Sequence, residues 1–231
     1  IFESMDTNLR HFMRHPDGKL WVNTSKVRAS FTFQLLSAIS YLHGTLSVIH
    51  RDIKPENILV SGPKLQKFIV KLADFGLSRE IGIELRDRTP VNVCTLWYRA
   101  PELLLGVTKY DFAVDMWSLG CVFAEFYTED HLPLFRTEEQ PGKIVELQQL
   151  HLILTSIWGR EFPSLDTWSD FHHCKTIAQQ FWRTQIEQWR NEAEITPALM
   201  LNSLIKELLQ LDSRKRYCAK VALEKHKATL T

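Results

Sequence analysis

Apolar residues recur at helical spacing through most of the chain. Between residues 24 and 42 they fall three or four positions apart, with Thr24 or Ser25 placed to cap the start and Gly44 to end the segment. Residues 115–127 are apolar on nearly every side, which is typical of a buried helix. The same reasoning predicts further helices around residues 144–154, 177–189, 201–211 and 219–223.

Two short apolar runs, at residues 58–60 and 68–72, flank the turn signal Ser61-Gly62-Pro63 and predict a pair of strands. Residues 79–95 have mixed charge and poor periodicity, which favours a long functional loop. The expected architecture is therefore mainly α, α+β overall, with one small β-hairpin inserted early.

Composition narrows the class of partner. The 231 residues are 45% hydrophobic and 24% charged, with a formal net charge of +1, so neither nucleic acid nor a membrane surface is an expected partner. The four cysteines form no C-x-x-C pair, which argues against zinc and favours an intracellular location, with nucleus and cytoplasm both open. No apolar run reaches the ~18–20 residues of a membrane span.

Four short motifs follow one another in a fixed order along the chain. They are His50-Arg51-Asp52-Ile53-Lys54-Pro55-Glu56-Asn57, Asp74-Phe75-Gly76, Ala100-Pro101-Glu102 and Asp115-Met116-Trp117-Ser118-Leu119-Gly120. Each alone is a weak signal, but the ordered set resembles the signatures of eukaryotic protein kinases. The resemblance covers residues 1–223 and implies a kinase-like fold, with residues 1–231 as a partial kinase domain made of the hinge and the helical C-terminal lobe.

The motif residues carry the groups that phosphoryl transfer requires. The transition state is loose, so catalysis consists mainly of positioning and charge neutralisation. Asp52 can orient the attacking hydroxyl and accept its proton, and the ammonium of Lys54 can reach the transferring group. Asn57 and Asp74 offer the hard oxygen donors that Mg²⁺ prefers. We therefore expect Asp52, Lys54 and Asn57 to act in catalysis, and Lys54, Asn57 and Asp74 to bind ATP and Mg²⁺.

The run TLWYRAPELLLG at residues 95–106 is similar to that of the cyclin-dependent kinases and their close relatives. Lys54, two places after Asp52, is the form found in Ser/Thr kinases. In the cyclin-dependent group the arginine that matches Arg99 helps to shape a pocket for proline just after the phospho-acceptor. The resemblance implies ATP-dependent, proline-directed transfer to Ser or Thr of protein substrates.

The start of the chain, FESMD at residues 2–6, resembles the kinase hinge. Adenine would then bond to backbone groups of Glu3 and Met5, with Phe2 as the gatekeeper and Leu59 under the ring.

The resemblance also implies control by the loop after residue 79. Arg51 and Arg79 match basic residues that hold a loop phosphate in relatives, and pairing with arginines can order such a loop. Thr89 is the nearest candidate for phosphorylation, although Pro90 stands where the family threonine often lies. Thr95 is expected to be structural or to take part in hydrogen bonding at the catalytic site.

Three residues match structural positions of the family. Arg216 matches the arginine that pairs with the glutamate of the third motif, Glu102, and Asp115 is expected to bond the catalytic-loop backbone. His50 is expected to pack beneath that loop rather than act as a base. The family usually has proline where Ser213 stands.

The sequence as given starts at the hinge, so the Gly-rich loop, the paired Lys and Glu and the cyclin-docking helix of the N-terminal β lobe are absent from it. We therefore expect this chain alone to be inactive, and a cyclin or another activator to bind through that lobe. A non-catalytic kinase-derived scaffold is the alternative, and a metal-dependent hydrolase is remote because it leaves the third and fourth motifs unexplained. His172-His173-Cys174 lacks a fourth ligand at metal spacing.

Overall fold

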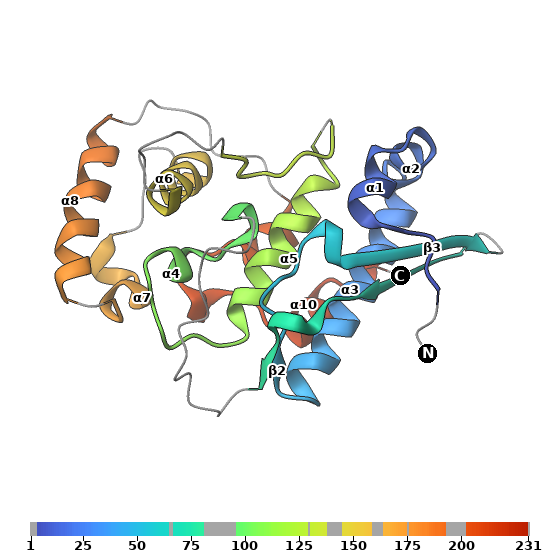
Figure 1. Ribbon diagram of the computed structural model, residues 1–231, viewed down its shortest axis with the longest axis horizontal. Coiled ribbons are helices and arrows are strands. Elements are labelled where there is room, and N and C mark those ends of the chain that lie inside the picture. Colours follow the sequence, from blue (N-terminus) through green and yellow to red (C-terminus); the bar gives the residue numbers. More distant parts are fainter. Residues whose placement is uncertain are drawn as a thin grey trace.

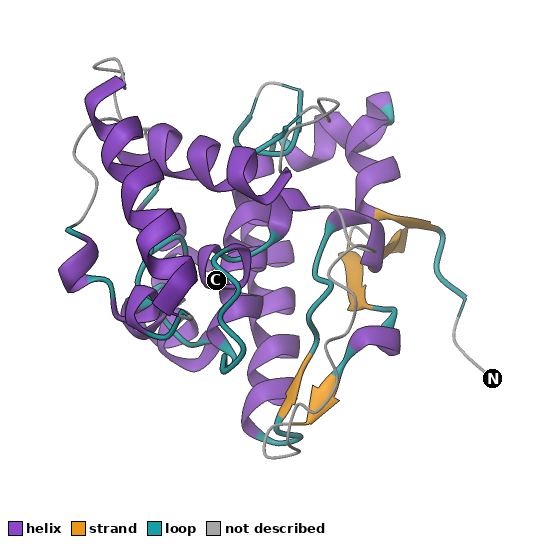
Figure 2. Ribbon diagram, turned by 60° about the vertical axis from the view of Figure 1, so that its left-hand side comes forward, coloured by secondary structure: helices purple, strands orange, loops and turns teal. Residues whose placement is uncertain are grey.

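The computed structural model describes residues 4–64, 67–80, 96–128, 130–137, 145–158, 164–174, 176–192 and 202–230. Helices dominate these residues, and the strands lie along one side of the helical body (Figure 2). Two long helices, α3 (Ser25–Gly44) and α5 (Ala113–Glu125), run through the middle of the molecule (Figure 1). The mainly α architecture with small β-sheets is the one predicted from the sequence.

Helix α3 follows the sequence prediction closely. Thr24 caps its start, because the side-chain oxygen accepts a hydrogen bond from the backbone N–H of Val27 at 3.4 Å. The apolar residues at helical spacing form its buried face, and the helix ends at Gly44. These buried residues are Val27, Phe31, Leu35, Leu36, Ile39 and Leu42.

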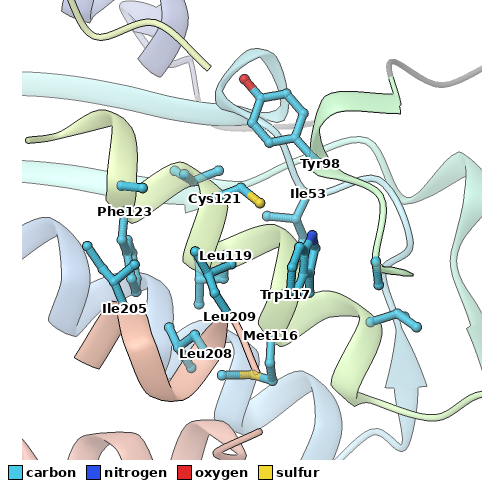
Figure 3. Close-up of a cluster of buried hydrophobic side chains, with 14 of the residues drawn as sticks. Ile53, Tyr98, Met116, Trp117, Leu119, Cys121, Phe123, Ile205, Leu208 and Leu209 are labelled. Carbon is cyan, nitrogen blue, oxygen red and sulfur yellow. The ribbon is translucent and has the colours of Figure 1, made fainter. Parts of the chain in front are cut away.

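Helix α5 is buried along almost its whole length, from residue 114 to residue 125. It ends at Glu125, two residues before the predicted end. Its apolar side chains pack against α9 (Ser203–Leu208), as Figure 3 shows for Leu119 and Leu208. A Cβ added to Gly120 would lie 2.9 Å from the Cβ of Leu208, so the two helices approach closely because this residue has no side chain.

The strands form two small antiparallel sheets. Strand β3 (Ile58–Lys64) pairs with β4 (Lys67–Leu72) and, on its other edge, with the two-residue β1 (Thr7–Asn8). The second sheet joins β2 (Val48–Ile49) to β5 (Arg79–Glu80). The predicted hairpin is present, but the placement of its turn was wrong: Ser61-Gly62-Pro63 lies within β3, where the register shifts at an irregularity between Ser61 and Lys64.

The later predicted helices are present with adjusted ends. They are α6 (Val145–Trp158), α8 (Thr176–Glu192), α9 and α10 (Ala219–Lys225). Helix α9 is shorter than predicted because Leu209 leaves the helical conformation, so Leu211 is buried beyond the helix rather than on its face.

Some short helices give little periodic signal and were not predicted. They are α1 (Leu9–Arg14), α2 (Pro16–Val22), α4 (Pro101–Leu104), α7 (Ser169–His172) and α11 (Lys227–Leu230), with single 3-10 turns η1 (Pro55–Asn57), η2 (Phe75–Leu77), η4 (Leu96–Tyr98), η5 (Leu165–Thr167) and η6 (Ser213–Lys215). Helices α1 and α2 lie beside the β3–β4 hairpin at one end of the molecule, and α6, α7 and α8 gather at the other (Figure 1). Within the part of the chain that the structure describes, no helix is long and apolar enough to cross a membrane.

Candidate active site

Helix α5 anchors the loop that carries the first motif. Asp115, which is fully buried in the first turn of α5, accepts hydrogen bonds from the backbone N–H groups of His50 at 2.7 Å and Arg51 at 2.8 Å. Its Oδ2 also lies 2.8 Å from Nε2 of His43 in α3. Ile53, 1% exposed, inserts into the core beside Trp117 (Figure 3). The loop is therefore fixed by both polar and apolar contacts.

On this fixed loop, two donors converge on one oxygen of Asp52. Lys54 Nζ donates to Oδ2 at 2.8 Å, and Asn57 Nδ2 donates to the same oxygen at 2.7 Å. Asn57 Nδ2 also donates to the backbone carbonyl of Asp52 at 2.9 Å. Asp52 and Lys54 are partly buried, and Asn57 is buried. The sequence-predicted catalytic residues thus form one connected cluster.

The β3–β4 hairpin brings the second motif back beside the loop that carries the first motif. The N–H of Ala73 donates to the carbonyl of Asn57 at 2.9 Å, and Nε2 of His50 lies 3.0 Å from the carbonyl of Ala73. The chain therefore delivers Asp74, the next residue, beside the catalytic loop. Asp74 is exposed, has a left-handed backbone (φ 60°), and accepts a hydrogen bond from the N–H of Gly76 at 3.2 Å.

His50 lies beneath this junction, fully buried, with its ring edge against Phe75 at a centroid distance of 4.9 Å. Burial lowers the pKa of His50 below its ordinary value, even though Asp115 and the carbonyl of Ala73 favour the charged form. The imidazole is therefore neutral near pH 7. Its position is consistent with the packing role expected from the sequence.

The donor set around Asn57 and Asp74 fits a magnesium ion. Because the amide nitrogen of Asn57 is directed at Asp52, its amide oxygen is left for a hard cation. Asp74 supplies an accessible carboxylate on the neighbouring segment. Asn57 and Asp74 would each supply one hard oxygen ligand to such an ion. Among the described residues, no group of three or more His, Cys, Asp and Glu side chains could hold a metal.

The structure describes only some of the residues that are expected to bind adenine. Leu59 is half-buried in β3, paired with Asn8 of β1 and Lys71 of β4. Met5 is described and half-buried. Glu3 and the expected gatekeeper Phe2 lie outside the described residues.

The basic residues expected to hold a loop phosphate have different surroundings. Arg51 donates through Nε to the carbonyl of Leu77 at 2.5 Å and through Nη1 to the hydroxyl of Tyr110 at 3.1 Å. Arg79 is exposed in β5. Thr89 and Thr95, the two loop threonines of the prediction, lie outside the described residues.

Arg99, expected to shape the substrate pocket, lines a small cavity between the catalytic loop and the third motif. Asp52 and Ile53 contribute the catalytic-loop wall of this cavity, and Ala100 and Leu103 contribute the other. The predicted catalytic and substrate-binding segments therefore face one space.

The third motif is tied to the end of the chain. Arg216 makes two bonds to Glu102, from Nη1 to Oε1 at 2.6 Å and from Nη2 to Oε2 at 2.7 Å, and its guanidinium lies over the ring of Trp117. The ion pair expected from the resemblance is present. Ser213, where the family usually has proline, donates to Asp170 through both its N–H and its hydroxyl, at 2.8 and 2.7 Å.

Sequence reasoning missed a second buried polar cluster behind the catalytic loop. Arg10 of α1 contacts Glu56, Tyr98 and Glu125, which come from three different segments. Burial raises the pKa of Glu125 to about 7, although Arg10 and Tyr98 both act to lower it. The one available signal was Glu125 itself, an acidic residue in an otherwise apolar helix.

The remaining candidate cluster, His172-His173-Cys174, has backbone partners. His172 Nε2 lies 3.2 Å from the carbonyl of Asp166, His173 Nδ1 lies 2.9 Å from that of Ser169, and Cys174 Sγ donates to that of Asp170 at 3.8 Å. These contacts account for the three side chains as parts of the fold.

Comparison with known proteins agrees with the geometry. The protein kinase domain family model matches residues 1–227. Cyclin-dependent kinase 2 of Caenorhabditis elegans is 36% identical over 228 residues, which cover 96% of this chain and 56% of that protein. Cyclin-dependent kinase E-1 of Arabidopsis thaliana is 34% identical over 236 residues, covering 96% and 48% respectively. The chain thus spans about half the length of these curated relatives.

A solved structure, the yeast RNA Pol II CTD kinase CTDK-1 complex, superposes with a TM-score of 0.73 at 28% identity, covering 96% of this chain and 68% of that one. The family match spans nearly the whole sequence and includes all four motifs. The chain therefore belongs to the protein kinase family, with the sequence character of its cyclin-dependent kinase-like serine/threonine branch.

Proposed function

We propose that the protein containing this chain transfers the γ-phosphoryl group of ATP to Ser or Thr hydroxyls of protein substrates. The observation that carries the proposal is the convergence of Lys54 Nζ and Asn57 Nδ2 on Asp52 Oδ2. This arrangement holds a carboxylate, an ammonium and an amide together on one rigid loop, which a non-catalytic lobe has no physical need to maintain. A scaffold without catalysis is the alternative.

In this mechanism, Asp52 accepts a hydrogen bond from the substrate hydroxyl and orients its oxygen toward the γ-phosphorus. As the new oxygen–phosphorus bond forms and the bond to the β–γ bridging oxygen breaks, Asp52 takes the hydroxyl proton. Lys54, already held against Asp52, neutralises charge on the transferring group. Asn57 and Asp74 would hold Mg²⁺, which would offset the negative charge of the phosphate groups.

We also propose that the acceptor is followed by proline. Arg99 lines the cavity next to Asp52, which supports a role in choosing the residue just after the acceptor. Proline lacks a backbone N–H, so a site that offers no acceptor for that group discriminates in its favour.

A protein activator of the cyclin kind is the third part of the proposal. It is supported by the similarity to two cyclin-dependent kinases and to a kinase solved as a complex.

The test is transfer of labelled phosphate from ATP by the protein as its gene encodes it, with paired peptides that contain Ser-Pro or Ser-Ala. The proposal predicts Mg²⁺-dependent transfer and a kcat/KM at least about tenfold higher for Ser-Pro, equivalent to ~1.4 kcal/mol. Equal rates for the two peptides would remove the proline preference alone. Nucleotide binding without any transfer, in the presence of a cyclin, would favour the scaffold.

A further inference from the structure

Arg10 occupies an unusual place for an arginine. It lies in the six-residue helix α1, directly after β1, and only 6% of it is exposed. Lys and Arg are almost never buried to this degree unless they are paired. Burial of its guanidinium therefore requires partners from the surrounding segments.

Every N–H group of this guanidinium has a partner. Nε donates to Glu56 Oε1 at 2.9 Å, and Nη1 donates to Glu125 Oε2 at 2.6 Å and to the carbonyl of His131 at 3.2 Å. Nη2 donates to Glu125 Oε1 at 3.3 Å and to the hydroxyl of Tyr98. These five bonds use the five donors that an arginine has. A lysine, with three donors and no planar fork, cannot reproduce the set.

One of these partners belongs to the catalytic loop. Glu56 lies in η1, directly before Asn57, whose side chain holds Asp52 at 2.7 Å. A shift of Glu56 is therefore transmitted through one peptide bond to a residue that orients the expected base.

A second partner belongs to the segment expected to bind substrate. Tyr98 ends η4 and directly precedes Arg99, and its hydroxyl also donates to Glu125 at 2.5 Å. The carbonyl of Tyr98 accepts a hydrogen bond from Ser118 of α5 at 2.7 Å. Arg10 and Glu125 thus hold the ring end of Tyr98 while α5 holds its backbone.

Stability alone does not account for this cluster. A buried ion pair is often no more stabilising than apolar residues of similar volume, because desolvation of the charges offsets their attraction. The five directional hydrogen bonds fix the position of Glu56 relative to Tyr98, which apolar packing would not do.

We propose that Arg10 is a positioning residue: it fixes the catalytic loop, through Glu56, against the substrate-binding segment, through Tyr98. This inference rests on the proposed kinase function and extends it to a residue outside the four motifs. Arg10 contacts neither nucleotide nor acceptor in this account. Its effect passes through Asn57 and Asp52 on one side and Arg99 on the other.

The test compares Arg10→Lys with Arg14→Lys in the complete protein, saturated with its activator. Arg14 lies on the same helix, is exposed, and provides the matched control. Small misplacements of catalytic groups cost up to about 100-fold. We therefore expect Arg10→Lys to lower kcat about 10- to 100-fold, with the KM for ATP within about twofold, whereas Arg14→Lys matches the wild type. An unchanged kcat in a folded Arg10→Lys variant overturns the proposal.

Hydrogen–deuterium exchange gives a second readout that does not need activity. In Arg10→Lys, amides of residues 52–57 and 97–104 should exchange about tenfold faster, while those of α3 keep the wild-type rate. Uniform acceleration across the whole domain indicates a merely structural role and overturns the inference. If the wild type transfers no phosphate, the kinase proposal fails, and this exchange pattern still decides whether Arg10 couples the two segments.

Should Arg10→Lys not fold, Glu56→Gln replaces it. The Glu56 side chain is 43% exposed, so this change removes the charged bond to Arg10 with little effect on the core. The same pattern of faster exchange in residues 52–57 supports the inference, and wild-type exchange there contradicts it.

Discussion

Glu102 and Arg216 form a buried two-bond ion pair although 114 residues separate them in the sequence. Their side chains are 1% and 0% exposed. Arg216 also donates to the carbonyls of Gln210 and Leu211 at 2.7 and 3.1 Å, so it connects α4 with the segment after α9. The pair therefore fastens the segment that follows the 81–95 region to the helical core.

Breaking this ion pair should lower the stability of the fold. Glu102→Gln leaves the Arg216 guanidinium buried without its counter-charge, and we expect the free energy of unfolding to fall by about 3–5 kcal/mol. Urea denaturation followed by circular dichroism measures the change. Arg183→Gln is the matched control, because it breaks the Arg183–Asp166 pair, whose side chains are 49% and 74% exposed, and should cost no more than ~1 kcal/mol. Equal losses in the two variants would contradict the assignment.

Because α5 and α9 approach closely, we expect any side chain at position 120 to lower the stability of the fold. In Gly120→Ala the new Cβ would meet Leu208 Cβ and Leu209 Cδ2, each at 2.9 Å. Helices must then separate or repack, and we expect a loss of about 1–3 kcal/mol. Gly44→Ala is the control, since among the described residues no atom outside its chain neighbours and its own helix backbone lies within 4 Å of a Cβ there. It should leave stability unchanged or raise it by about 0.4–1 kcal/mol. A neutral Gly120→Ala would disprove the close packing.

The burial of His50 predicts that its contribution to stability changes with pH in a defined direction. Because burial lowers its pKa in the folded protein, the unfolded chain takes up the proton first as the pH falls below 6.5. The contribution of His50 to stability is therefore present above pH 6.5 and is lost as the pH falls below it. Nuclear magnetic resonance should show the His50 imidazole titrating below 6.5. A midpoint at or above 6.5 would contradict the buried, neutral assignment.

Global stability is the wrong readout for His50, because Glu125 acts in the opposite direction. Its pKa rises from 4.5 to about 7 on burial, so its contribution is greatest below pH 4.5 and is lost as the pH rises toward 7. Resolving the His50 resonance itself separates the two groups.

Local sequence signals accounted for the long helices and the catalytic loop. The cap at Thr24 and the apolar spacing of α3 are both encoded within about twenty neighbouring residues, so they could be predicted. The link between Asp115 and the loop backbone was also expected, because it belongs to a motif. The rules of helix capping and helical periodicity describe the first two features, and the family resemblance describes the third.

The Arg10 cluster could not be predicted in the same way. Its members come from α1, η1, η4 and α5, and the contact between Arg10 and Glu125 spans 115 positions. No periodic pattern marks a single arginine in a short helix. The turn of the hairpin was misplaced for a different reason: Gly62 and Pro63 are usually turn residues, but here a strand irregularity accommodates them.

The central claim is that Asp52 is the catalytic carboxylate, and phosphate transfer by Asp52→Asn tests it most directly. The complete protein, with the proposed cyclin-type activator, should be assayed on a Ser-Pro peptide. The control is Asp17→Asn, whose carboxylate is 86% exposed and distant from the motifs in sequence. We predict that Asp52→Asn lowers kcat by about 10²–10⁴-fold while Asp17→Asn keeps the wild-type rate. A folded Asp52→Asn protein that retained wild-type kcat would contradict the account.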